Sequence, residues 1–132
     1  MMPEPTMKTP RPTDGELMIL RVLWERGPST VRQVHDILTR ERPTAYTTAL
    51  KLLQIMTDKG LVTRNESERA HVYQATAPEE ATQKQLVRDL VDRAFGGSAS
   101  QLVLHALATR KTSRRDLARI RELLDELEGG ER

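Results

Sequence analysis

The chain has 132 residues, of which 37% are hydrophobic but only 3% aromatic, and it contains no cysteine. This length suits one modest domain or two small ones that share a core. A core with so few aromatic side chains must be built from Leu, Val, Ile and Ala, which favours packed helices over an aromatic-rich sandwich. Without cysteine, disulfides and thiolate metal sites are excluded, and a reducing cytoplasm is the expected compartment.

The charge balance of the chain is mildly basic. The formal net charge is +2 and the sequence pI is about 9.2, values that permit nucleic-acid binding without requiring it. No apolar run approaches the length of a membrane span and no signal-peptide pattern opens the chain, so we expect no membrane insertion. Residues 1–12 contain four prolines and little to bury, which predicts a disordered lead-in.

Three short helices are predicted between residues 13 and 59. Thr13 and Glu16 have the spacing of a capping box and begin the first helix. Ser29 is expected to cap the second helix and Thr44 the third. A stop signal follows each helix in turn: Gly27-Pro28, Arg42-Pro43 and Gly60.

A hairpin is predicted after the third helix. Residues 61–64 (LVTR) and 71–75 (HVYQA) are strand-like, and a polar turn separates them. Three helices followed by a hairpin form the winged helix-turn-helix arrangement, in which the third helix enters the major groove of DNA. The predicted fold is therefore mostly α with a small β-hairpin, and residues 13–76 form its winged-helix DNA-binding domain.

The polar face of the third helix is unusual because it carries no carboxylate before Asp58. A solvated helix usually alternates Glu and Lys on its outer face. The short hydroxyls of Thr47 and Thr48 would let the helix N-terminus approach a phosphate closely. Lys51 can reach guanine or a phosphate, and Gln54 can form a two-point contact with adenine. The alternative is an ordinary solvated surface.

The predicted wing adds two cations, Arg64 and Arg69, on either side of its tip. Both could reach the phosphate backbone or the minor groove. Two rival functions stay open at this stage. One is a winged protein-interaction module without a DNA ligand, and the other is a one-component regulator with a small-molecule pocket in its C-terminal half.

Residues 77–128 are predicted to form a helical dimerisation domain, followed by a tail at 129–132. Gly96-Gly97 separates two helices, and Ser98 and Ser113 are expected to cap the second and third. These helices could pack within one chain, but a region this small closes little core alone, so we favour a two-fold dimer. The predicted interface residues are Leu86, Leu90, Val91, Phe95, Leu102, Val103, Leu107, Leu117, Ile120, Leu124 and Leu127.

Catalytic and metal sites are not indicated by the sequence. His35, His71 and His105 lie on separate predicted elements with no matching ligands near them in sequence. The chain contains no nucleophile elbow, phosphate-binding loop or paired-carboxylate motif. We therefore predict no metal, no cofactor and no enzymatic activity.

Four segments resemble the penicillinase-repressor family, the BlaI/MecI group of winged-helix repressors, with the CopY repressors as relatives. They are ELMILRVLWERGPSTVRQVHDIL (16–38), AYTTALKLLQIMTDKGLVTR (45–64), RAHVYQA (69–75) and FGGSASQLVLHAL (95–107). The resemblance runs from about Asp14 to Leu127. It implies a homodimeric transcriptional repressor that binds a palindromic operator in double-stranded DNA.

The resemblance also implies how the repressor is released and which residues contact DNA. In the family, a membrane-bound sensor metalloprotease leads to cleavage within the dimerisation half. The scissile Asn-Phe pair of the family aligns near His105-Ala106, which differs from it, and the CopY-like cysteine cluster is missing. Together with the analysis of the polar face, the resemblance gives these predicted DNA contacts: Thr44, Thr47, Thr48, Leu50, Lys51, Gln54, Arg64 and Arg69.

Overall fold

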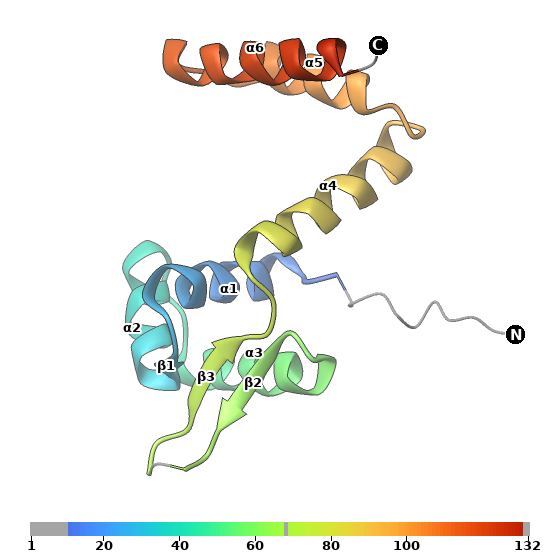
Figure 1. The fold of residues 1–132 in the computed structure, drawn as a ribbon. Helices are drawn as coiled ribbons and strands as arrows, with labels where there is room; N and C mark the ends of the chain where they lie inside the picture. The colour runs from blue at the N-terminus through green and yellow to red at the C-terminus, as the bar shows by residue number, and fades with distance from the viewer. Residues whose placement is uncertain (1–10, 68, 131–132) are drawn as a thin grey trace, which may run out of the picture. The chain divides into compact units, whose positions relative to one another are not determined.

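The computed structural model describes residues 11–67 and 69–130, which form six α-helices and one three-stranded sheet (Figure 1). The chain divides into two compact units, an N-terminal unit up to Leu86 and a C-terminal unit from Val87. The elements are, in chain order, α1 (Asp14–Arg26), β1 (Ser29–Thr30), α2 (Val31–Glu41), α3 (Tyr46–Lys59), β2 (Val62–Asn65), β3 (Val72–Ala75), α4 (Glu79–Ala94), α5 (Ala99–Thr109) and α6 (Arg114–Gly129).

The first helix begins at the predicted capping box. The amide of Glu16 donates to the Thr13 hydroxyl over 3.2 Å, and the amide of Thr13 donates to the Glu16 carboxylate over 2.9 Å. The helix ends at Gly27, whose φ of 87° lies in the left-handed region that other residues avoid. Both predicted limits of α1 are therefore confirmed.

The cap of α2 differs from the prediction. Thr30, and not Ser29, caps the helix, because Thr30 and Gln33 form a second capping box. Ser29 is buried in β1, where its hydroxyl donates to the carbonyl of Gly27 over 2.8 Å. The sequence placed the helix one residue early because it gave no sign that Ser29 belongs to a strand.

The cap of α3 also differs from the prediction. Ala45 occupies the cap position, and no side chain satisfies the free amides there. The hydroxyl of Thr44 instead donates to the carbonyl of Arg42 over 2.9 Å, inside the turn that joins α2 to α3. Ser and Thr side chains commonly stabilise turns in this way, so the turn, and not the helix, uses this hydroxyl.

The sheet consists of the predicted hairpin and one additional strand. β2 and β3 are antiparallel, with Arg64 opposite Tyr73. The two-residue β1 pairs with the other edge of β3, which places Ser29 opposite Tyr73 and gives the strand order β1-β3-β2. A strand of two residues is too short to produce a hydrophobic period, so the sequence did not predict it.

The core of the N-terminal unit lies between its three helices and its sheet. The largest buried side chains are those of Tyr73, Ile19, Leu53 and Met56. Trp24, partly buried at this core, donates from its indole nitrogen to the carbonyl of Ala77 over 2.9 Å. The segment after β3 is thereby fastened to α1 before α4 begins.

An ion pair between a buried carboxylate on α1 and a partly exposed ammonium at the end of α3 joins the two helices. The carboxylate of Glu16 is only 2% exposed and accepts from the Lys59 ammonium at 3.0 Å on each oxygen. Burial alone would raise the pKa of Glu16, but the amide of Thr13 and the charge of Lys59 outweigh it, so the pKa lies below its usual value. This pair fixes the C-terminal end of α3 to the first turn of α1.

The C-terminal unit continues α4 and adds α5 and α6, and none of the residues of these three helices is buried. Gly96 and Gly97 have φ values of 57° and 87° and form the predicted break. Ser98 and Ser113 accept from the amides of Gln101 and Asp116 and cap α5 and α6, as predicted. Large hydrophobic side chains stay exposed on all three helices: Val87, Leu90, Val103, Leu104, Leu107, Leu123, Leu124 and Leu127.

Candidate nucleic-acid interface

The side chains that the sequence predicted to form a polar outer face on α3 are exposed in the structure. Thr47, Thr48, Lys51 and Gln54 are all exposed, while Ala49, Leu53 and Met56 on the opposite face of the same helix are buried. Within residues 11–67 and 69–130, Lys51 takes part in no ion pair. The helix therefore presents hydroxyl, ammonium and amide groups to solvent on a rigid, core-anchored element.

The turn before α3 is fixed by side chains of α2. The carbonyl of Thr44 lies 2.7 Å from Nε2 of His35 and 3.3 Å from the Thr39 hydroxyl. Because a carbonyl can only accept, the imidazole must carry its proton on Nε2. The His35 ring also contacts the ring of Tyr46 edge to face, with centroids 5.7 Å apart. Thr44 thus positions the start of α3.

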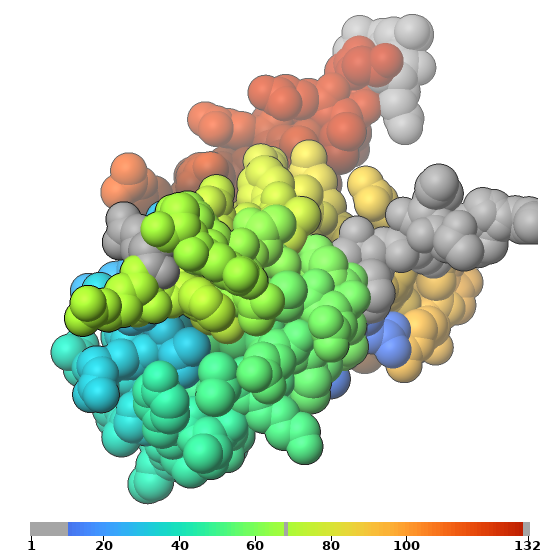
Figure 2. Space-filling view, turned by 90° about the horizontal axis from the view of Figure 1, so that it is seen from below, coloured from blue at the N-terminus to red at the C-terminus, as the bar shows by residue number. Residues whose placement is uncertain are grey.

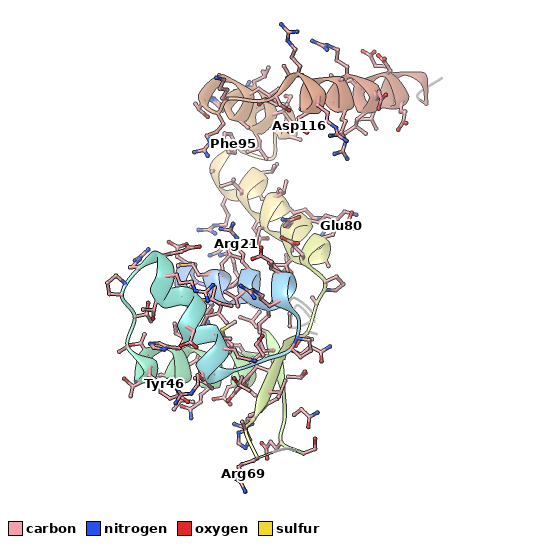
Figure 3. All side chains as sticks on the ribbon, turned by 90° about the vertical axis from the view of Figure 1, so that its left-hand side faces the viewer. Arg21, Tyr46, Arg69, Glu80, Phe95 and Asp116 are labelled. Atoms are coloured by element: carbon pink, nitrogen blue, oxygen red, sulfur yellow. The ribbon has the colours of Figure 1, made fainter. Side chains whose placement is uncertain are left out.

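An open cleft of about 370 Å³ lies between α2, the start of α3 and β3. Arg32, Tyr46, Leu50, Arg69 and His71 are among the residues that line it. Figure 2 shows this side of the N-terminal unit, with the hairpin in yellow-green beside α3 in green. Figure 3 marks Tyr46 near the start of α3 and Arg69 at the far end of the wing. The cleft brings together cations from two separate elements.

Three of these lining residues were missed by the sequence analysis: Arg32, Tyr46 and His71. Each looks like an ordinary polar surface residue in the sequence, and only the packing of β3 beside α2 and α3 brings them to one cleft. Leu50 was predicted as a DNA contact from the family resemblance. It is partly buried against the core and also lines the cleft, so one side of it stays accessible.

The two wing arginines differ in what they are bonded to. The guanidinium of Arg64 donates to the Tyr73 hydroxyl and to Glu66, the latter at 2.5 Å, and these partners raise its pKa further. Arg69 is exposed and forms no ion pair with any described residue. The sequence treated the two residues alike, whereas the geometry leaves Arg69 the more available of the two for an anionic ligand.

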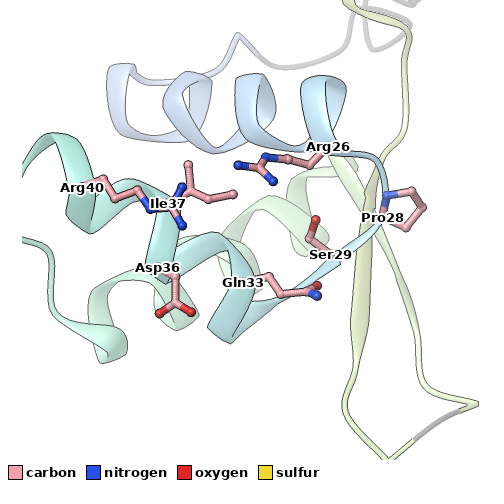
Figure 4. A pocket seen from close by; sticks show the side chains of 7 residues that line it. All are labelled: Arg26, Pro28, Ser29, Gln33, Asp36, Ile37 and Arg40. Atoms are coloured by element: carbon pink, nitrogen blue, oxygen red, sulfur yellow. The ribbon is translucent and has the colours of Figure 1, made fainter.

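A second hollow, of about 270 Å³, lies between the end of α1 and α2 (Figure 4). Its lining includes Arg26, Asp36 and Arg40, so both signs of charge are present. It is open to solvent and has few apolar side chains, unlike the enclosed pockets that bind small molecules. We assign it no ligand.

Two kinds of feature are absent from the part of the chain that the structure describes. No group of three or more His, Asp or Glu side chains there could hold a metal ion. No helix there is both long and apolar enough to cross a membrane.

The sequence profile of the penicillinase repressor family matches residues 12–126. The chain belongs to the penicillinase repressor family. The predicted resemblance is thus confirmed, and because this family consists of transcriptional repressors, the chain is a transcriptional regulator and not an enzyme.

Individual relatives agree with this assignment. The "Transcriptional regulator BlaI" of Mycobacterium tuberculosis, strains CDC 1551 / Oshkosh and ATCC 25618 / H37Rv, is 34% identical over 125 residues, covering 93% of this chain and 89% of the relative. The solution structure of the DNA-binding domain of the repressor BlaI superposes with a TM-score of 0.50 at 24% identity, over 55% of this chain and 88% of that domain. The predicted winged-helix fold is confirmed.

Proposed function

We propose that this protein is a sequence-specific repressor that binds a palindromic operator as a homodimer in the cytoplasm. The observation that carries the proposal is the exposed face of α3, where Thr47, Thr48, Lys51 and Gln54 stand together without a carboxylate. Phosphates would repel carboxylates on this face, and base edges need donors and acceptors of these kinds. The 34% identity to a transcriptional regulator over 93% of the chain supports the proposal.

Each group on this side of the N-terminal unit has a distinct role in the proposed complex. Lys51 and Gln54 contact base edges in the major groove, and Thr47 and Thr48 allow the helix to approach a phosphate. Leu50 packs against a thymine methyl or a sugar. Arg32 and Arg69, from opposite sides of the cleft, contact phosphates that flank the helix.

A mobility-shift titration on the DNA upstream of the chain's own gene tests whether the exposed face of α3 contacts DNA bases. Lys51→Ala and Gln54→Ala should each weaken binding by about 1–3 kcal/mol if they contact bases. Arg21→Ala, an exposed cation on α1, removes the same charge as Lys51→Ala and should change little. If Lys51→Ala and Gln54→Ala bind like the wild type, the assigned face is wrong.

A salt titration separates this function from a protein-interaction module. Binding through several phosphates releases counterions, so affinity should fall steeply as salt rises. A protein-interaction module would not bind duplex DNA at any salt concentration. Specific affinity at physiological salt is expected in the range of about 10⁻⁸ to 10⁻¹¹ M.

The proposed dimer forms through the predicted helical region, residues 77–128. No residue of α4, α5 or α6 is buried within one chain, and exposed apolar surface on this scale is typical of interaction sites. A second copy would cover the predicted interface residues and present two α3 helices to two half-sites. These residues are Leu86, Leu90, Val91, Phe95, Leu102, Val103, Leu107, Leu117, Ile120, Leu124 and Leu127.

We further propose, from the family resemblance, that a membrane-bound sensor metalloprotease ends repression through cleavage near His105-Ala106. Both residues are exposed, and they lie inside α5, where the Thr109 hydroxyl donates to the His105 carbonyl over 2.8 Å. Local unwinding of α5 must precede cleavage, and the cut would separate α6 from α4. Mass spectrometry of the repressor from induced cells should find a fragment that ends near His105. An intact chain in such cells would contradict this route.

A further inference from the structure

One large hydrophobic side chain of the N-terminal unit is exposed. Within residues 11–67 and 69–86, every large hydrophobic side chain is buried or partly buried except that of Tyr46, which is 44% exposed. Tyr46 is the first residue of α3 (Figure 3). The contacts proposed above give its ring no role, although it lies on the helix that is proposed to bind DNA.

The ring of Tyr46 is held in place by a neighbouring ring. His35 contacts it edge to face, with centroids 5.7 Å apart and an angle of 70° between the planes. His35 is itself fixed, because its Nε2 lies 2.7 Å from the carbonyl of Thr44. A tyrosine has few rotatable bonds, so a ring supported in this way loses little conformational entropy when it contacts a ligand. The exposed part of the ring is therefore a preorganised apolar surface.

The position of Tyr46 along α3 indicates which ligand it meets. Tyr46, Leu50 and Gln54 follow one another at intervals of four residues, so they form one row on the helix. The neighbouring row contains the exposed Thr47 and Lys51. Two side chains with apolar surface therefore lie in one row with Gln54, which is proposed to contact a base edge.

The cleft beside this row supplies cations for the same ligand. Tyr46 and Leu50 line the cleft together with Arg32 and Arg69. Phosphates bound by these guanidinium groups would bring the major groove close to the first turn of α3, the part of a recognition helix that contacts base edges. The apolar group that base edges present in the major groove is the C5 methyl group of thymine.

We propose that Tyr46 determines part of the operator specificity by packing its ring against the C5 methyl group of a thymine. This inference rests on the proposed binding of α3 to DNA, and it names one chemical feature of the DNA that the protein selects. The contact is apolar, so it needs the ring of Tyr46 and not the hydroxyl.

Replacement of thymine by deoxyuridine tests the contact directly, because it removes the methyl group and leaves base pairing unchanged. Wild-type protein first locates the operator on DNA upstream of its own gene, and each thymine of the half-sites is then replaced in turn. For at least one thymine in each half-site, mobility-shift titration should show a loss of affinity of about fourfold, which is ~0.8 kcal/mol. Tyr46→Ala should bind the thymine and deoxyuridine duplexes equally at that position.

Two further variants separate this contact from a general loss of binding. Tyr46→Phe keeps the ring and should keep the fourfold difference between the two duplexes. Lys51→Ala should bind both duplexes more weakly but with the same ratio of affinities. Since each ratio compares two duplexes on one protein, a fraction of unfolded protein does not change it.

A gain of affinity is expected when the methyl group is returned on another base. A cytosine·guanine pair in place of the contacted thymine·adenine pair lacks the methyl group, and 5-methylcytosine restores it at the same place in the major groove. Wild-type protein should bind the 5-methylcytosine duplex about fourfold more tightly than the cytosine duplex. Tyr46→Ala should not distinguish the two.

The contrary outcomes identify what has failed. A wild-type protein that retards the operator but binds thymine and deoxyuridine equally at every position would overturn the inference and leave the proposed repressor function intact. A fourfold loss that Tyr46→Ala retains would assign the methyl contact to another residue, and a loss that Tyr46→Phe abolishes would assign the contact to the hydroxyl. Either result would also overturn the inference. A wild-type protein that binds no duplex would refute the proposed function, and this inference with it.

Discussion

The two units of this chain contain similar aliphatic residues but use them differently. In the N-terminal unit, Leu, Val and Ile side chains from α1, α2, α3 and the sheet bury one another within one chain. In α4, α5 and α6 no side chain is buried, and leucines such as Leu104, which is 61% exposed, face solvent. Apolar content therefore does not decide whether a region forms a core. What decides it is whether one chain supplies both sides of the core, and this difference predicts how each unit responds to mutation and dilution.

The largest effect is expected from charged residues in the predicted apolar seam of α6, which consists of Leu117, Ile120, Leu124 and Leu127. Ile120→Asp combined with Leu124→Asp would bury carboxylates between apolar surfaces, which costs several kcal/mol. The dimer should weaken by about 100-fold or more. Light scattering across a dilution series should show monomers. In a mobility-shift titration, these monomers should bind the operator weakly. A double variant that remains dimeric would show that the seam is misassigned.

The next effect concerns the closed core of the N-terminal unit. Leu53 is fully buried, so Leu53→Ala should lower the free energy of unfolding by about 2–5 kcal/mol. Chemical denaturation should give the same loss at low and high protein concentration, because this core needs no second chain. The exposed Leu104→Ala is the matched control. A loss for Leu53→Ala that depends on concentration would contradict the comparison.

A smaller effect is expected at the ion pair between the buried Glu16 and the partly exposed Lys59. Lys59→Met would leave the Glu16 carboxylate without its ammonium partner and should cost about 1–3 kcal/mol at neutral pH. Folding lowers the pKa of Glu16 below its usual value of 4.5. The wild type therefore has the full stabilising contribution of this carboxylate above pH 4.5, and it loses that contribution as the pH falls through the lower pKa of the folded state. The variant should lose less stability on acidification.

The control for this pair is Lys84→Met. On α4, the Lys84 ammonium lies 3.7 Å from a carboxylate oxygen of Glu80, and both side chains are largely exposed. This pair should therefore contribute little to the free energy of unfolding. Equal losses for the two variants, measured by urea denaturation at neutral pH, would mean that burial adds nothing to the Glu16–Lys59 pair.

The smallest effect distinguishes the wing arginines. Arg69→Ala should weaken operator binding and lower the slope of the salt dependence by about one, as expected for one lost phosphate contact. Arg32→Ala should act similarly from the other side of the cleft. Arg64→Ala should change the slope less, because Glu66 already neutralises this guanidinium. Equal slopes for the Arg64 and Arg69 variants would contradict the distinction.

Much of the fold could be predicted from local signals in the sequence. The capping box at Thr13, the glycine stops and the Ser98 and Ser113 caps depend on contacts within a few residues, and the structure contains them all. The assignments of Ser29 and Thr44 failed because each hydroxyl serves a neighbouring element. The burial of Glu16 was also missed, since its partner Lys59 is far away in the sequence.

The candidate site was predictable only in part, because some of its residues come from elements that are far apart in the sequence. The polar face of α3 follows from helical spacing, so the sequence alone is enough to assign its residues: Thr47, Thr48, Lys51 and Gln54. Cleft residues such as Arg32 and His71 come together only when the sheet packs beside α2 and α3. No local pattern could distinguish Arg64 from Arg69, because the difference lies in contacts with Glu66 and Tyr73.

The most direct test of the account is the stoichiometry of the complex with DNA. Native mass spectrometry or sedimentation, at low ionic strength and with a duplex from upstream of the chain's own gene, should find two chains on each duplex. The complex should dissociate steeply as salt is added. A duplex that the protein fails to retard, or one saturated by a single chain, would contradict the proposal that two copies close the C-terminal core and bind the operator together.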